Sequence, residues 1–202
     1  MEGKDWLVTS DGKYQACKSV RTWDLITENY RLYRFLTELE DILKKQLEET
    51  NYLAEIRQLV RRLLVNSYWI KTQHPESDNQ TGTSVKLLYD ELGFPFTVQT
   101  VTFTKGTQSN IHNHGTWGIV AVLKGQEKNT IWKRNPTVEH PDKIETVGEI
   151  ILNPGDIVSF APGAIHSVEA IEEPTVTFNL YGETRSKERF EFDIVNHTAK
   201  NF

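Results

Sequence analysis

The sequence predicts a mainly β protein, a barrel or a sandwich, preceded by an α-helical segment. Three observations indicate this fold class. Apolar residues recur at spacings of three and four between residues 25 and 66, which is the period of an amphipathic helix. Beyond the loop-forming stretch "HPESDNQTGTS", short apolar runs are separated by Gly and Pro turns. A length of 202 residues suits one domain with a sizeable core, so residues 1–202 are taken as a single domain.

Two helices are expected between residues 25 and 66. The first is marked by Leu32, Phe35, Leu36, Leu39, Ile42, Leu43 and Leu47. The second follows the helix-start residues Thr50 and Asn51 and is marked by Leu53, Ile56, Leu59, Val60, Leu63 and Leu64. Apolar stripes of this kind pack against the same chain or against a second copy, and packing within the chain is the preferred interpretation. The expected assembly is a monomer or a homodimer.

The β-barrel is expected over about residues 84–195. Six segments are candidate strands: residues 97–104, 117–125, 128–134, 149–153, 156–161 and 174–182. Many short strands at such regular spacing are typical of barrels and sandwiches.

Charge and composition exclude several classes of function. The net charge is −5 and no block of Lys or Arg is present, so nucleic acid is not an expected partner. No run approaches the roughly 20 apolar residues that span a bilayer, and "MEGKDWLVTS" lacks the apolar stretch of a secretory signal. We therefore expect a cytoplasmic protein without a membrane partner. Cys17 is the single cysteine, which rules out an intrachain disulfide or a thiolate cluster.

Histidines are the candidate metal ligands. His112 and His114 stand two residues apart in "SNIHNHGTWGIVAVLKG", directly before an apolar run. On an extended segment such residues point to the same face, so both imidazoles can reach one ion. His166 follows the turn at Pro162 and Gly163 and is the third candidate. A His-x-His pair also occurs by chance in surface and core positions. The remaining histidines are interpreted as surface residues: His74, His140 and His197.

Glycines around the histidines complete a longer pattern. Gly106 precedes the His-x-His pair, Gly125 closes the strand after it, and Gly155 opens the segment that leads to His166. This arrangement resembles the paired motifs of the cupin superfamily over about residues 84–185. The resemblance implies a double-stranded β-helix, or jelly-roll barrel, with the N-terminal helices packed on it.

One position departs from the usual cupin pattern. In most cupins a glutamate four residues after the second histidine is a fourth ligand, and Gly118 stands there in this sequence. Three histidines with glycine at that place, within "HNHGTWG", are similar to the thiol dioxygenase branch, which includes cysteine dioxygenase and 3-mercaptopropionate dioxygenase. The resemblance implies Fe(II) held by His112, His114 and His166, and addition of O₂ to the sulfur of a small thiol to give a sulfinate. The ligand types alone leave the metal open, because imidazole also binds Zn, Ni and Cu.

The strand "TVTFNLYG" places Thr177, Asn179 and Tyr181 on one face. Its periodicity alone favours a half-exposed strand with a polar side in water. Thiol dioxygenases carry Ser-x-His-x-Tyr here, facing the metal, so the resemblance implies catalytic roles for these three residues. Asn179 replaces the family's histidine, and an amide can hydrogen-bond but cannot shuttle a proton near neutral pH.

Basic and aromatic residues are candidates for binding the substrate. The family's carboxylate-binding arginine aligns with Lys86, which equally fits an ordinary solvated lysine. Bacterial relatives use an arginine after the tyrosine strand, for which Arg185 is taken first and Arg189 second. Trp117 is expected to pack near the substrate pocket, and filling of the core explains an aromatic residue there equally well.

Two other functions remain open on the sequence. One is a different reaction at the three-histidine site, such as oxygenation of a carbon acid or an isomerisation. The other is a metal- or ligand-binding module without catalysis, which the missing relay histidine favours.

Overall fold

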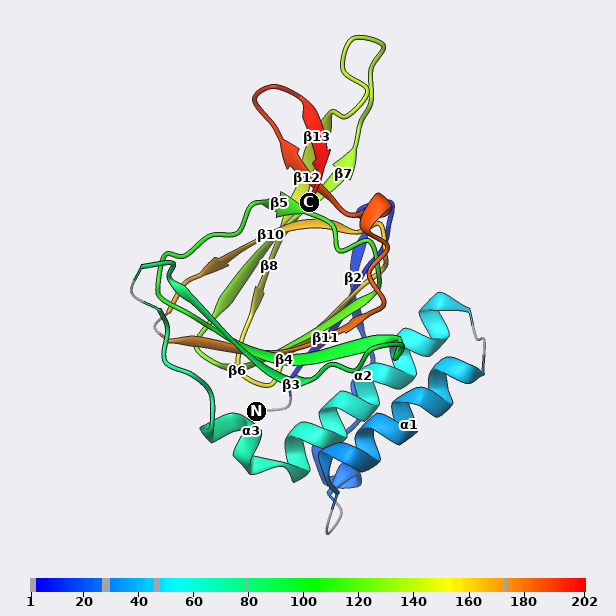
Figure 1. Ribbon diagram of the computed structural model, residues 1–202, viewed down its shortest axis with the longest axis vertical. Helices are drawn as coiled ribbons and strands as arrows, with labels where there is room; N and C mark the ends of the chain where they lie inside the picture. Colours follow the sequence, from blue (N-terminus) through cyan, green and yellow to red (C-terminus); the bar gives the residue numbers. More distant parts are fainter. Residues whose placement is uncertain (1–2, 27–29, 46–47, 79, 173) are drawn as a thin grey trace.

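The computed structural model describes residues 3–26, 30–45, 48–78, 80–172 and 174–202. Two β-sheets curve around a common interior, and helices lie along the outer face of one of them (Figure 1). This architecture confirms the mainly β class and is consistent with a jelly roll.

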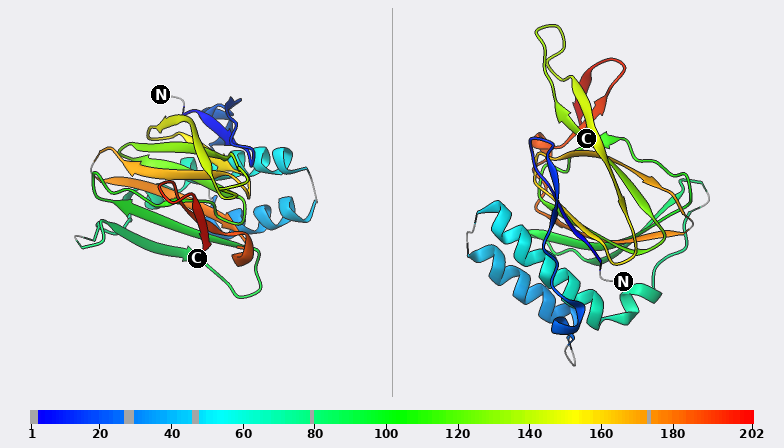
Figure 2. Two further views of the ribbon diagram at one scale, coloured as in Figure 1. Left: turned by 90° about the horizontal axis from the view of Figure 1, so that it is seen from above. Right: turned by 180° about the vertical axis from the view of Figure 1, so that it is seen from behind.

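Each sheet draws its strands from distant parts of the chain. The seven-stranded sheet has the spatial order β2 (Tyr14–Cys17), β1 (Asp5–Val8), β9 (Ile157–Phe160), β6 (Gly118–Lys124), β11 (Thr175–Gly182), β4 (Phe96–Phe103) and β3 (Thr83–Tyr89). The six-stranded sheet has the order β13 (Thr198–Asn201), β12 (Phe190–Asp193), β5 (Ile111–His112), β10 (Ile165–Ala170), β7 (Glu127–Arg134) and β8 (Ile144–Leu152). The hairpins β7–β8 and β12–β13 extend beyond the barrel (Figures 1 and 2).

All six predicted strands fall on observed strands, although β8 begins at Ile144, earlier than predicted. The longer strands β3 and β10 were not among the predicted strands. Sequence periodicity also did not single out the short strands β1, β2, β5, β12 and β13. These strands have two to four residues, too few for a period to be visible, and they form because a partner strand supplies their hydrogen bonds.

The helical segment consists of η1 (Thr22–Leu25), α1 (Leu32–Lys44), α2 (Glu49–Asn66) and α3 (Tyr68–Thr72), and a second 3₁₀ turn, η2 (Ser186–Glu188), follows β11. The prediction that helix begins near residue 25 is wrong, because Arg31 is still extended and α1 begins at Leu32. Leu47 lies outside the described residues. Thr50 and Asn51 lie inside the first turn of α2 rather than ahead of it. In the part of the chain that the structure describes, no helix has the length and apolar character to cross a bilayer.

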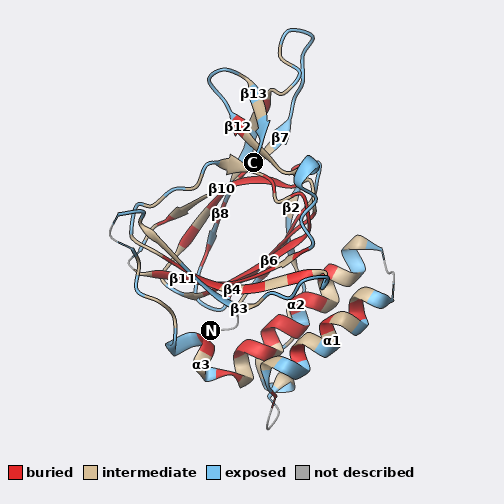
Figure 3. Ribbon diagram, in the orientation of Figure 1, coloured by how far each residue is buried: buried red, intermediate tan, exposed pale blue. Residues whose placement is uncertain are grey.

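The seven-stranded sheet is buried on both faces, which explains the unbroken apolar run of β6. On its outer face, Phe178 and Leu180 pack in one cluster with Phe35 and Leu39 of α1. Figure 3 shows that α1 and α2 carry buried segments beside this sheet. The rings of Phe35 and Phe178 meet edge to face at 6.3 Å between centroids. A second cluster, which includes Val120 and Val158, fills the interior between the sheets. The alternation along each strand therefore separates helix-facing residues from interior residues.

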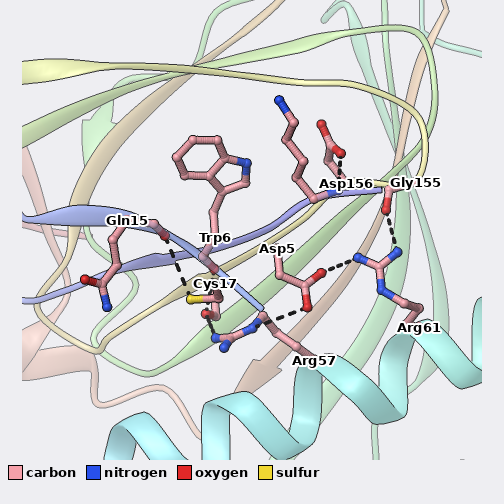
Figure 4. Close-up of polar contacts among 10 residues, drawn as sticks. Asp5, Trp6, Gln15, Cys17, Arg57, Arg61, Gly155 and Asp156 are labelled. Atoms are coloured by element: carbon pink, nitrogen blue, oxygen red, sulfur yellow. Dashed lines mark hydrogen bonds and ion pairs between the residues drawn. The ribbon is translucent and has the colours of Figure 1, made fainter. Parts of the chain in front are cut away.

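A buried ion-pair cluster ties α2 to the N-terminal strand (Figure 4). The Asp5 carboxylate on β1 receives a hydrogen bond from the Arg61 guanidinium and lies 3.9 Å from Nε of Arg57. Arg61 Nη1 also donates to the Gly155 carbonyl at 2.9 Å, and Arg57 Nη1 donates to Ser159 Oγ at 2.5 Å. All three charged side chains are almost fully buried. The Asp5 carboxylate thus neutralises charge that α2 carries into the core.

We predict that Asp5→Ala lowers the free energy of unfolding by about 3–5 kcal/mol, because it leaves two buried guanidinium groups without their carboxylate. The exposed pair between Arg21 and Asp24 is the matched control. Asp24→Ala should cost at most about 1 kcal/mol. Urea denaturation of both variants measures the difference, and equal losses would contradict the structural role of Asp5.

Candidate metal centre

Three histidines from two segments converge inside the barrel mouth. His112 ends β5, His114 lies two residues further along, just before the bend at Gly115, and His166 lies on β10. Strands β5 and β10 pair so that His112 and His166 are register partners and point to the same side. One ligand nitrogen from each of the three rings lies within 4.8 Å of the other two, and Nε2 of His114 is 2.9 Å from Nε2 of His166. The structure therefore brings together the three predicted ligands.

Hydrogen bonds fix which nitrogen two of the rings, His112 and His166, can offer to a metal. Nδ1 of His112 lies 2.9 Å from the Asn110 carbonyl oxygen, which can only accept, so this nitrogen carries the proton. Nδ1 of His166 lies 2.8 Å from Oδ1 of Asn129 and donates to it. In both rings the lone pair is then on Nε2, and for His166 this nitrogen faces His114. Orientation of this kind by an outer partner is typical of metal-binding histidines.

Burial keeps the three rings neutral. Desolvation lowers the pKa of His112 and takes the pKa of His114 and His166 well below its usual range. Repulsion by His112 adds to the lowering in His114 and His166. Three neutral imidazoles with free lone pairs are competent ligands without prior loss of a proton.

The donor set fits a divalent transition metal. Two nitrogens at about 2.0–2.1 Å from one ion and at right angles to each other would be about 2.9 Å apart, the separation seen between His114 and His166. Among the residues that the structure describes, the group that can hold an ion contains histidines and no carboxylate. Imidazole ligands suit Fe, Zn, Ni and Cu rather than Mg or Ca.

Tyr181 occupies the space that a side chain at residue 118 would need. A Cβ atom on Gly118 would lie 3.0 Å from Cδ1 and Cε1 of the Tyr181 ring. That ring also lies against His114, with centroids 4.6 Å apart and planes tilted by 30°. A carboxylate side chain at residue 118 would crowd the Tyr181 ring, so glycine at this position leaves room for the tyrosine beside the metal centre.

The three polar residues of β11 form a buried hydrogen-bonded chain. The Tyr181 hydroxyl donates to Oδ1 of Asn179 at 3.1 Å, and Nδ2 of Asn179 donates to Oγ1 of Thr177 at 2.8 Å. Thr177 and Asn179 are buried, so the alternative of a polar face in water is wrong for this strand. Burial raises the pKa of Tyr181, which keeps the phenol protonated and able to donate.

Two interior residues on β7 were not anticipated. Asn129 accepts the hydrogen bond from His166 and donates from Nδ2 to Oε1 of Glu127 at 2.8 Å. Glu127 is 2% exposed, and its burial raises the pKa of the carboxyl to about 7. Both residues stand at a spacing of two from the interior residue Ile131, so the sequence predicts that their side chains share its interior face. Their proximity to His166 depends on the pairing of β7 with β10, which periodicity does not reveal.

Lys86 lies away from the metal centre. It is exposed on the edge strand β3, pairs with Thr100, and donates from Nζ to the Gln73 carbonyl at 3.1 Å. Thr100 in turn pairs with Phe178, so Lys86 belongs to the sheet face opposite to Tyr181. This position agrees with the alternative of a solvated lysine.

Trp117 and Arg185 share a cavity of about 380 Å³ on the helix side of the sheet. Trp117 is buried and meets the Tyr52 ring of α2 edge to face at 6.2 Å, as the core-filling alternative describes. Arg185 is exposed and lies 3.5 Å from the Glu188 carboxylate. Neither side chain is directed into the barrel beside the histidines.

Arg189 lies near His112 and His114. Its charge lowers the pKa of His112 and His114. Its guanidinium carbon is 4.0 Å from the centre of the Phe202 ring, which itself meets His112 edge on at 6.2 Å. The Nε atom of Arg189 is buried and has no hydrogen-bond partner among the described residues. Of the two candidate arginines, Arg189 is therefore the one that lies near these histidines.

The histidines outside the centre are partly buried rather than fully exposed. Nδ1 of His74 lies 3.3 Å from the Pro75 carbonyl oxygen. His140 and His197 are in ring contact at 4.6 Å, so they join the two protruding hairpins.

Several solved structures, among them a cupin superfamily protein, are similar in fold to part of this chain. No protein-family profile matches the chain. A cupin superfamily protein from Desulfitobacterium hafniense is 12% identical with a TM-score of 0.43, over 56% of this chain and 86% of that one. KdgF from Halomonas sp. is 19% identical with a TM-score of 0.42, over 57% of this chain and 92% of that one. Oxalate oxidase in complex with glycolate is 16% identical with a TM-score of 0.41, over 56% of each chain. Likenesses this low assign no activity to the chain.

We predict that His166→Ala abolishes tight binding of a divalent metal, because only His112 and His114 remain as ligands. The barrel should stay folded, because main-chain pairing holds β10 to β5 and β7. His74→Ala is the control and should keep full occupancy. Elemental analysis and circular dichroism of both proteins measure the outcome. Unchanged metal content in the His166 variant would remove this residue from the ligand set.

A second prediction concerns the stability of the metal-free protein. The pKa of Glu127 rises from its ordinary value of 4.5 to about 7 in the folded chain, so between these values the folded state binds the extra proton. Stability conferred by this proton is present at low pH and is lost as the pH rises toward 7. Glu127→Gln removes this dependence.

Relative to the parent protein, the variant should therefore gain up to about 1.4 kcal/mol of unfolding free energy per pH unit between roughly pH 5 and 7. Comparing the two proteins at each pH cancels the contribution of the histidines. A difference that stays constant across this range would contradict the raised pKa.

Proposed function

We propose that this protein is a mononuclear non-haem iron dioxygenase that adds O₂ to the sulfur of a small thiol, in the manner of cysteine dioxygenase-like cupins. The observation that carries the proposal is a set of three neutral imidazoles without a carboxylate, beside a protonated phenol. The reaction converts RSH and O₂ to RSO₂H. Sulfur loses four electrons and O₂ gains them, so no external reductant is needed.

His112, His114 and His166 would hold Fe(II) through their Nε2 atoms. The iron, when bound, would supply the redox chemistry through which O₂ takes electrons from the sulfur. Tyr181 stacks on His114 and donates its one hydroxyl proton to Oδ1 of Asn179, so toward the interior the phenol oxygen can accept a hydrogen bond from the substrate. Nδ2 of Asn179 donates to Thr177, which holds the amide in this orientation.

Arg189 is the candidate for binding a carboxylate on the substrate. A guanidinium offers a planar pair of donors that matches a carboxylate, and its Nε has no hydrogen-bond partner within the described chain. Phe202 covers one face of the guanidinium and leaves the edges of the fork for hydrogen bonds. Arg185 and Lys86, which point elsewhere, are not needed for this role.

Asn179 determines how the site handles protons. The chain from Tyr181 to Thr177 contains no group that titrates near neutral pH, so it can orient the phenol without relaying a proton. The same observation favours the second candidate, a three-histidine cupin that carries out carbon-acid oxygenation or isomerisation, or that binds a ligand without turnover.

We predict that the iron-loaded protein consumes O₂ with cysteine or 3-mercaptopropionate and forms one sulfinate per O₂. An oxygen electrode and mass spectrometry measure the two quantities, and His166→Ala protein treated with iron in the same way is the inactive control. Absence of uptake with every small thiol, in protein shown to contain iron, rejects this function. Tight ligand binding without turnover would support the binding module instead.

Arg189→Gln should raise KM for a carboxylate-bearing thiol by about 10- to 100-fold, since a charged hydrogen bond contributes about 1.5–3 kcal/mol. Arg185→Gln is the matched control, because the side chain is exposed and outside the barrel interior. Steady-state kinetics of both variants provide the test. A larger effect at Arg185 than at Arg189 would reverse the assignment.

A further inference from the structure

Two buried polar residues on β7 extend from His166 away from the metal centre. Glu127 and Asn129 are 2% and 0% exposed and share the interior face of the strand. Asn129 lies between them, 2.8 Å from Glu127 through Nδ2 and 2.8 Å from His166 through Oδ1. Burying these groups is costly unless each hydrogen bond is made, so their arrangement is strongly constrained.

The chemistry of the groups sets the direction of both hydrogen bonds. Nδ2 of Asn129 donates to Oε1 of Glu127, and once Glu127 is ionised, above its raised pKa, its carboxylate only accepts, so the side of Asn129 that faces it must be the NH₂ group. The oxygen of the amide then faces His166 and can only accept. Nδ1 of His166 must therefore carry the proton, which leaves the lone pair on Nε2, the atom 2.9 Å from Nε2 of His114. An asparagine alone does not have this effect, because its amide can turn over and offer a donor instead.

We propose that Glu127 and Asn129 are positioning residues that together hold His166 in the tautomer that binds the metal. Glu127 fixes the orientation of the Asn129 amide, and the amide fixes the proton on Nδ1. The inference rests on the three-histidine metal centre and does not depend on the thiol reaction. It assigns a function to a carboxyl group that has no direct contact with the proposed substrate.

A comparison with His112 shows why such a device is needed at His166. His112 donates to a main-chain carbonyl, which has no alternative role and fixes the tautomer alone. His166 instead faces a side-chain amide in the interior, where donor and acceptor have nearly the same shape. The acceptor-only carboxylate behind the amide removes the ambiguity.

Three variants separate positioning from packing. Asn129→Leu removes the acceptor for His166, and Glu127→Met removes the group that orients the amide. The double variant Glu127→Gln with Asn129→Asp exchanges amide and carboxylate, so the acceptor-only group then faces His166 directly. Thr100→Val is the control, since Thr100 is buried on the helix-facing side of the other sheet and its hydroxyl has no hydrogen-bond partner among the described residues.

Zn²⁺ affinity, measured by competition with a chromogenic chelator, should fall about 10- to 100-fold in Asn129→Leu and in Glu127→Met. The exchanged double variant and Thr100→Val should stay within a few-fold of the parent protein. Long-range ¹H–¹⁵N NMR of the metal-free protein reports the tautomer directly. It should show the proton of His166 on Nδ1 in the parent and in the double variant, and a share on Nε2 in the Glu127→Met variant.

Parent protein with the His166 proton on Nε2 would overturn the inference, as would undiminished Zn²⁺ affinity in Asn129→Leu. Failure of the double variant to restore affinity, with its fold intact by circular dichroism, would also count against it. An absence of thiol oxygenation would leave all of these readouts unchanged, so the two proposals fail independently.

Discussion

The antiparallel pairing of β5 with β10 is the constraint on which the candidate site depends. It sets His112 directly opposite His166 and points both rings into the interior. His114 joins them because it is two residues further along the same extended segment. A shift of one residue in this register would turn the His166 ring to the other face of the sheet, so the three histidines would no longer lie together. The strand β5 has only two residues, so its neighbours β10 and β12 hold it in place.

The interior of the barrel has an apolar part and a polar part. Val120, Val158 and their neighbours fill the apolar part and stabilise the two sheets against each other. In the polar part, one hydrogen-bonded chain on β11 ends at Tyr181 and another on β7 ends at His166. Each chain satisfies its buried groups, which makes the polar part tolerable in a core and fixes the side chains around the metal centre. Gly118 is part of the same arrangement, because the Tyr181 ring occupies the space beside it.

The helices support the site from outside. They cover the outer face of the seven-stranded sheet, and the Asp5 cluster anchors α2 to β1 and β9. Burial on both faces makes this sheet a rigid base for the polar residues of β11. The charged residues near the opening differ in their surroundings. Arg185 has a carboxylate partner in water, whereas Arg189 is partly buried beside Phe202 and the histidines.

The sequence by itself determined the mainly β class, two helices, six strands and the three candidate ligands, because periods of 3.6 and 2 and the His-x-His spacing are local properties. It did not determine where α1 begins, which arginine lies near the histidines, or that Lys86 faces away from Tyr181. It also did not reveal Glu127 and Asn129 as partners of His166. These features depend on strand register and on contacts between residues as far apart as His114 and His166, which are 52 positions apart in the sequence. Such pairings are decided by hydrogen bonding and packing across the whole barrel, and only the tertiary structure contains that information.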